Sequence, residues 1–239
     1  MPLSLQTQWT LVASGLIAHA DEVMAGEECE RLMALLDERA DEDEYSDWFE
    51  LVSDPDRLFA QLDALPDLPE EHHRAVLEEA WLMAAADGKR VPEEAEMLGR
   101  VARKLGVESV QLDFWREAWT AAQNATCEAG TRAIVYCLVG GDRSAAKDQR
   151  DVAQRVWDAL PVTDDQQPTL QRLLTEVHSE TETLRQINAL ERPHRKVVLR
   201  AVAQVMRLAA DDKAHERFRQ LADDAGLDDE VIATLLRGD

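Results

Sequence analysis

The chain has 239 residues, enough for one large domain or two small ones, and 45% of them are apolar, which is ordinary for a globular core. Its formal net charge of −22 argues against a surface that binds nucleic acid or an anionic membrane, because both depend on clustered Lys and Arg. A field of this sign attracts cations and basic proteins instead.

The charge is distributed unevenly along the chain. Residues 1–119 hold 10 Lys and Arg against 28 Asp and Glu, whereas residues 120–239 hold 16 against 20. Sparse Gly and Pro favour helix over strand, and no segment alternates apolar and polar residues with a period of two. We therefore expect an all-α protein whose acidic sites lie in its first half.

The sequence also bears on location. No apolar run approaches the roughly 18 residues that a helix needs to span a bilayer, and the start MPLSLQTQW lacks the basic stretch and apolar core of an export signal. The cysteines form no CxxC pair and their number is odd, so neither a disulfide framework nor a zinc knuckle is expected. We expect a cytoplasmic protein without a transmembrane segment. The cysteines are Cys29, Cys127 and Cys137.

The first predicted element is a helical hairpin over residues 11–36. Apolar residues before Asp21 recur on one face of an α-helix, and they do so again after it. Glu28 follows Asp21 by seven residues and opens the second helix. The apolar positions are Trp9, Val12, Leu16, Ile17 and Ala20 before the turn, and Cys29, Leu32, Met33 and Leu36 after it.

Between the hairpins the chain is acidic and irregular. Residues 37–56 are rich in Asp and Glu but include Tyr45, Trp48 and Phe49, which predicts a short packed helix amid solvated charge. Residues 161–168, with two prolines, have the composition of a connection between two helices.

The second hairpin covers residues 76–107 and turns at Asp87. Glu94 follows Asp87 by seven residues, the same offset as in the first hairpin. Gly106 is expected to close the second helix, because glycine accepts the left-handed conformation there. A short third helix is predicted to follow, and its apolar positions are Val110, Phe114 and Ala118.

The second half repeats the pattern with less fidelity. A third turn at Asp142 is followed by Asp148, and a fourth at Asp211 is followed by Glu216. Asp21 precedes Asp142 by 121 residues, and Asp87 precedes Asp211 by 124. We therefore interpret the chain as a duplication of a module of about 120 residues, a common domain size, so that each half forms one domain.

Four carboxylates in the first half are candidate metal ligands. Such oxygens suit hard cations such as Ca²⁺, Mg²⁺ or Mn²⁺, and two hairpins packed about a pseudo-twofold axis would bring four of them together. The alternative is structural, because acids in the first turn of a helix complement its partial positive charge without any metal. The four residues, called the acidic quartet below, are Asp21, Glu28, Asp87 and Glu94.

Catalytic motifs are missing from the sequence. It contains no HExxH, Walker-type glycine loop, GxGxxG or GxSxG, and its six histidines are scattered. His19, two residues before Asp21, is a candidate auxiliary ligand, with a capping or packing role as its alternative. We predict no catalytic role.

The second turn resembles that of the TerB-like family of tellurite-resistance proteins. It reads AAADG at 84–88 with Glu94 opening the next helix, whereas at Asp21 the glycine is replaced by Glu22. The resemblance covers residues 8–119, and the second half shares it only through internal similarity. It implies two tandem TerB-like helical bundles, metal binding by the acidic residues and a part in a stress response of the tellurite type.

These features together predict a non-enzymatic protein that binds a divalent cation through the acidic quartet and acts in stress response or as an interaction module. The alternative is a metal-free helical scaffold whose acidic face binds a basic protein partner. A metal-dependent hydrolase on a helical bundle would need a nucleophile or base that the sequence does not show.

Overall fold

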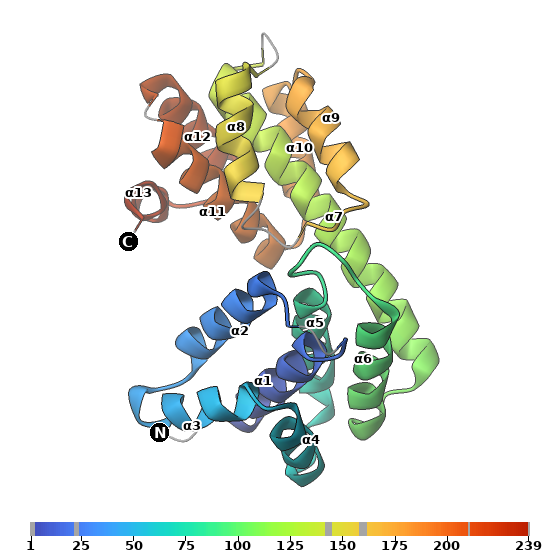
Figure 1. Ribbon diagram of the computed structural model, residues 1–239. Coiled ribbons are helices and arrows are strands. Elements are labelled where there is room, and N and C mark those ends of the chain that lie inside the picture. The colour runs from blue at the N-terminus through green and yellow to red at the C-terminus, as the bar shows by residue number, and fades with distance from the viewer. Residues whose placement is uncertain (1–2, 22–23, 142–144, 158–161, 210, 239) are drawn as a thin grey trace. The chain divides into compact units, whose positions relative to one another are not determined.

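The fold is entirely helical over the residues that the structure, a computed structural model, describes. These residues form thirteen helices and no strand, which confirms the predicted all-α class. They divide into two compact units, residues 1–119 and 120–239 (Figure 1). Within the described ranges no helix is both long and apolar enough to cross a membrane. The described residues are 3–21, 24–141, 145–157, 162–209 and 211–238.

The first unit is built from six helices and the start of a seventh. They are α1 (Leu5–Ala18), α2 (Gly26–Arg39), α3 (Glu42–Val52), α4 (Pro55–Ala64), α5 (Glu70–Met83), α6 (Pro92–Lys104) and α7 (Ser109–Val139). Helix α1 lies at the centre, with α5 alongside it and α2, α4 and α6 also packed against it (Figure 1). Both predicted hairpins, α1–α2 and α5–α6, are therefore present and meet through their first helices.

Helix α1 is more deeply buried than a one-sided apolar stripe suggests. Every residue from Trp9 to Ala18 is buried, including the polar Thr10 and Ser14. Small residues allow this close approach, since a Cβ atom on Gly15 would lie 2.9 Å from Cδ1 of Leu58 in α4. The helix thus forms the axis about which the first unit is assembled.

Helix α7 differs from its prediction in length and in orientation. It runs for 31 residues rather than forming a short third helix. Val110 and Phe114 are 80% and 69% exposed, whereas Leu112 and Trp119 are buried. Two apolar stripes compete on this helix, and the one that carries tryptophan has more area to bury. The predicted apolar face of this helix is therefore wrong.

The second unit contains the end of α7 and six further helices. They are α8 (Lys147–Trp157), α9 (Gln167–Thr175), α10 (Glu180–Ala189), α11 (Arg192–Ala209), α12 (Asp212–Asp224) and α13 (Asp229–Arg237). Helix α11 is the centre of this unit and packs against α8, α10, α12 and α13. Gly226, with φ of 83°, closes α12 in the left-handed conformation, as Gly106 with φ of 76° closes α6.

Candidate functional site

Glu28 and Glu94 occupy equivalent positions at the start of α2 and α6. Each is the third residue of its helix and accepts a hydrogen bond from the residue before the helix. The Ala25 N–H donates to Oε2 of Glu28 at 2.8 Å, and the Val91 N–H donates to Oε2 of Glu94 at 2.7 Å. The reciprocal bond of a full capping box needs a side-chain acceptor that Ala25 and Val91 lack. Both glutamates thus satisfy a backbone donor that the helix leaves unpaired.

Both carboxyl groups are buried, with 5% of Glu28 and 3% of Glu94 exposed. Burial raises the pKa of Glu28 to about 7 and that of Glu94 to about 8, although the backbone hydrogen bonds act in the opposite direction. Nearby negative charges add to the effect of burial. Around neutral pH the two groups therefore hold protons that an exposed glutamate would have lost.

The pKa shifts also show that charges from both hairpins interact. Asp87, in the α5–α6 turn, raises the pKa of Glu28, and Asp21, in the α1–α2 turn, raises that of Glu94. The Glu28 charge itself raises the pKa of Glu94. Asp21 and Asp87 are exposed. The structure thus brings the acidic quartet within electrostatic reach as two exposed and two buried carboxyl groups.

The acidic quartet is not arranged as a coordination sphere. Among the described residues, no three His, Cys, Asp or Glu side chains are grouped so as to hold a metal ion. Glu28 and Glu94 use Oε2 for the backbone, so Oε1 is the atom that each can offer to a cation. Asp87 accepts a hydrogen bond from the Lys89 N–H at 2.8 Å, which closes its turn. An all-oxygen donor set of this kind suits a hard cation.

His19 takes the packing role that the sequence left open. Its Nε2 donates a hydrogen bond to the Val52 carbonyl at 3.0 Å, and the side chain is half-buried. The ring thereby links the end of α1 to the end of α3.

Two arginine side chains lie against the ring of Trp81 in the second hairpin. The guanidinium groups of Arg90 and Arg116 lie 4.3 Å and 4.6 Å from the centre of the Trp81 ring. Arg90 directly precedes Val91, and Arg116 lies in α7. These contacts connect α5, the turn before α6 and α7, and so help to position the backbone that holds Glu94.

The third turn carries an amide where the first unit carries carboxylates. Gln149 is the third residue of α8, and its Oε1 accepts a hydrogen bond from the Ala146 N–H at 2.9 Å. It follows Asp142 by seven residues, the offset seen in the first unit, although Asp142 lies outside the described residues. Asp148, the predicted counterpart, is exposed. The equivalent residue is therefore Gln149, which the seven-residue offset would have identified.

The fourth turn is not a copy of the others. Helix α11 is described to Ala209 and α12 begins at Asp212, whereas residues 84–91 separate α5 from α6. Asp211 directly precedes α12 and accepts a hydrogen bond from the Lys213 N–H at 3.0 Å. The third residue of α12 is Ala214, which is fully buried, and Glu216 is exposed. Asp211 therefore caps the start of α12.

Comparison with known proteins bears on the first unit. Residues 9–117 match the sequence model of the family described as tellurite resistance protein TerB. No curated protein and no solved structure gives a match to the chain. The second tandem TerB-like domain that internal similarity predicts lies outside the family match and stays a prediction. The chain therefore contains one TerB domain, over residues 9–117.

Proposed function

We propose that the TerB domain of this chain binds a divalent cation of the Ca²⁺, Mg²⁺ or Mn²⁺ class through the acidic quartet, without catalysis. The match to the tellurite resistance protein TerB supports a part in stress response. The cation acts structurally in this proposal. Since no three His, Cys, Asp or Glu side chains are grouped around one point in the described residues, the proposal requires the acidic quartet to turn toward the cation. The cation then links the turn of one hairpin to that of the other and so sets the surface that the domain presents to a partner.

The observation that carries the proposal is a charge that helix capping does not require. In α8 the neutral Gln149 makes the same backbone hydrogen bond that Glu28 makes in α2. A buried carboxylate beside other carboxylates is unfavourable, and an amide of the same shape avoids that cost. A bound cation would offset the repulsion within the acidic quartet. Cation binding therefore accounts for the negative charge of Glu28 and Glu94, whereas the hydrogen bond requires only an acceptor.

Cation binding would be coupled to proton release. The pKa values of Glu28 and Glu94, about 7 and 8, mean that a cation must displace protons from them near neutral pH. The apparent affinity should therefore rise as the pH increases through this range. Exposed acids with ordinary pKa values would already be ionised and would show no such dependence.

The test is the melting temperature of the full chain during titration with Ca²⁺, Mg²⁺ and Mn²⁺. A cation at 100 times its Kd stabilises the folded state by about 2.7 kcal/mol, which raises the Tm of a chain of this size by several degrees. Asp21→Asn/Asp87→Asn should abolish the rise. The matched control is Glu27→Gln/Glu93→Gln, which removes the same charge from exposed neighbours and should keep it.

Two results would overturn the proposal. The first is the lack of any Tm rise with all three cations in the wild-type chain. The second is an equal rise in Asp21→Asn/Asp87→Asn, which would mean that the cations only screen the net charge. In either case the metal-free scaffold with a basic partner would replace it.

A further inference from the structure

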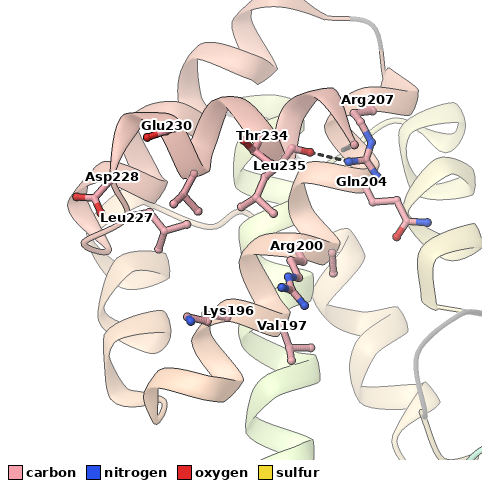
Figure 2. Close-up of a pocket in the computed structure, with 13 residues that line it drawn as sticks. Lys196, Val197, Arg200, Gln204, Arg207, Leu227, Asp228, Glu230, Thr234 and Leu235 are labelled. Atoms are coloured by element: carbon pink, nitrogen blue, oxygen red, sulfur yellow. Dashed lines mark hydrogen bonds between the residues drawn. The ribbon is translucent and has the colours of Figure 1, made fainter. Parts of the chain in front are cut away.

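The second unit carries a surface groove that lies outside the TerB match. It has a volume of about 880 Å³ and runs between α11 and α13. Figure 2 shows side chains of both helices facing each other across it. Since every lining residue belongs to the second unit, the groove is independent of the acidic quartet.

The floor of the groove is apolar and accessible. Val197 of α11 is 44% exposed and Val231 of α13 is 46% exposed. Ala201, Leu227 and Leu235 extend this apolar surface along the groove. Single exposed apolar residues need no explanation, but a contiguous set in a concave surface marks a site that binds apolar groups.

The α11 side of the groove is basic, in contrast to the chain as a whole. Helix α11 contains four Arg and one Lys but no Asp or Glu, in a chain with a net charge of −22. Lys196 and Arg200 line the groove, and neither is ion-paired with any residue that the structure describes. Arg207 instead donates to the Leu235 carbonyl at 2.6 Å and fixes the end of α13 (Figure 2). The free cations on this wall are complementary to carboxylates.

The residues that line the groove extend along about three turns of α11. Lys196 and Arg207 are eleven residues apart on α11, a span of about 16 Å or three helical turns. A helix of that length and about 10 Å in diameter occupies roughly 1,250 Å³. A groove of about 880 Å³ can therefore hold most of such a helix while one face stays in solvent.

We propose that this groove binds an acidic amphipathic helix of a partner protein. Its apolar stripe covers Val197 and Val231, and its carboxylates on one flank pair with Lys196 and Arg200. Asp228 and Glu230, on the α13 side, disfavour a helix that is acidic all round. An apolar floor with only two free cations favours such a helix over nucleic acid, whose binding rests on many phosphate contacts.

The probe is a fluorescent 14-residue peptide with leucines at helical spacing and glutamates on one flank, measured by anisotropy against the full chain. It should bind more weakly as salt is added, and the same peptide with lysine in place of glutamate should not bind. Arg200→Glu should weaken binding by about fivefold to tenfold, because one pairing becomes a repulsion. Arg192→Glu makes the same charge change on α11 outside the groove and should leave binding within about twofold.

Two further variants, each replacing an apolar residue with serine, test the apolar floor of the groove separately. Val231→Ser should weaken binding, whereas Leu208→Ser, at a residue 56% exposed but outside the groove, should not. Equal binding of the two peptides, or equal effects of Arg200→Glu and Arg192→Glu, would overturn the proposal. It would also be overturned if duplex DNA displaced the peptide, or if the chain formed a dimer that Val231→Ser dissociates, since the occupant would then be nucleic acid or a second copy.

Discussion

The starts of α2 and α6 in the first unit and of α8 in the second share a hydrogen bond but not a charge. Glu28, Glu94 and Gln149 each accept the N–H of the residue that precedes their helix. Only the first unit does this with ionisable groups, and it buries them. The comparison separates the requirement of the helix, which is an acceptor, from the presence of negative charge. The charge must then have consequences for stability and binding that the second unit lacks.

The largest of these consequences should be a dependence of stability on pH. Glu28 and Glu94 have folded-state pKa values of about 7 and 8, above their ordinary value of 4.5. Between pH 4.5 and these raised values, the folded state therefore binds more protons than the unfolded state. Without divalent cations, the stabilisation is complete below pH 4.5 and is lost as the pH rises through 7 and 8. Since one pKa unit corresponds to about 1.4 kcal/mol, the free energy of unfolding should fall by roughly 3 kcal/mol for Glu28 and roughly 5 kcal/mol for Glu94.

Hydrogen exchange at pH 5 and pH 9, after correction for intrinsic rates, measures this difference in each unit separately. Protection of α1 and α5 should decrease at high pH, whereas protection of α11 should change much less. An equal loss in both units would mean that general charge repulsion, and not the two buried glutamates, governs the pH dependence.

A carboxylate placed in α12 should show why the fourth turn cannot hold one. Ala214 is fully buried, so Ala214→Glu introduces both an oversized side chain and an uncompensated charge. We expect the second unit to lose about 4 kcal/mol of stability. Urea unfolding with hydrogen exchange at α12 measures this, and Ala233→Glu, at an exposed position of α13, is the control. Wild-type protection in Ala214→Glu would contradict the described packing of α12.

Replacing the two buried glutamates of the first unit with glutamine, the residue found at the equivalent position of α8, should stabilise the first unit. Glu28→Gln/Glu94→Gln keeps the acceptor and removes the buried charge. At pH 8 without divalent cations we expect a net gain of about 3 kcal/mol, which is less than the summed cost of the two ionised groups because each buried amide carries a desolvation cost of its own. Thermal unfolding at pH 5 and pH 8 should show that the variant loses most of the wild-type pH dependence. A variant less stable than wild type at pH 8 would show that the negative charges stabilise the fold without a cation.

The smallest effect should come from the hydrogen bond itself. Glu28→Ala/Glu94→Ala removes the charge and the acceptor together, which leaves the N–H groups of Ala25 and Val91 without their partners. This variant should be less stable than Glu28→Gln/Glu94→Gln by about 1 kcal/mol per site. Equal stability of the alanine and glutamine variants at pH 8 would mean that water replaces the bond at no cost.

Several elements could be predicted because their signals are local. The apolar periodicity on both sides of Asp21 and Asp87 identified the hairpins, and Gly106 marked the end of α6. Burial was predicted less well. The choice between Val110 with Phe114 and Leu112 with Trp119 depends on which stripe meets the rest of the core, and periodicity alone ranks the two equally.

The sequence by itself determined an all-helical fold and a pair of acidic turns with one spacing, because helix period, glycine placement and charge are read from neighbouring residues. Only the tertiary structure decided that Glu28 and Glu94 are buried while Asp21 and Asp87 are exposed, and that the four charges interact. Burial and electrostatic proximity depend on how α1 and α5 pack, and those helices are far apart in the sequence.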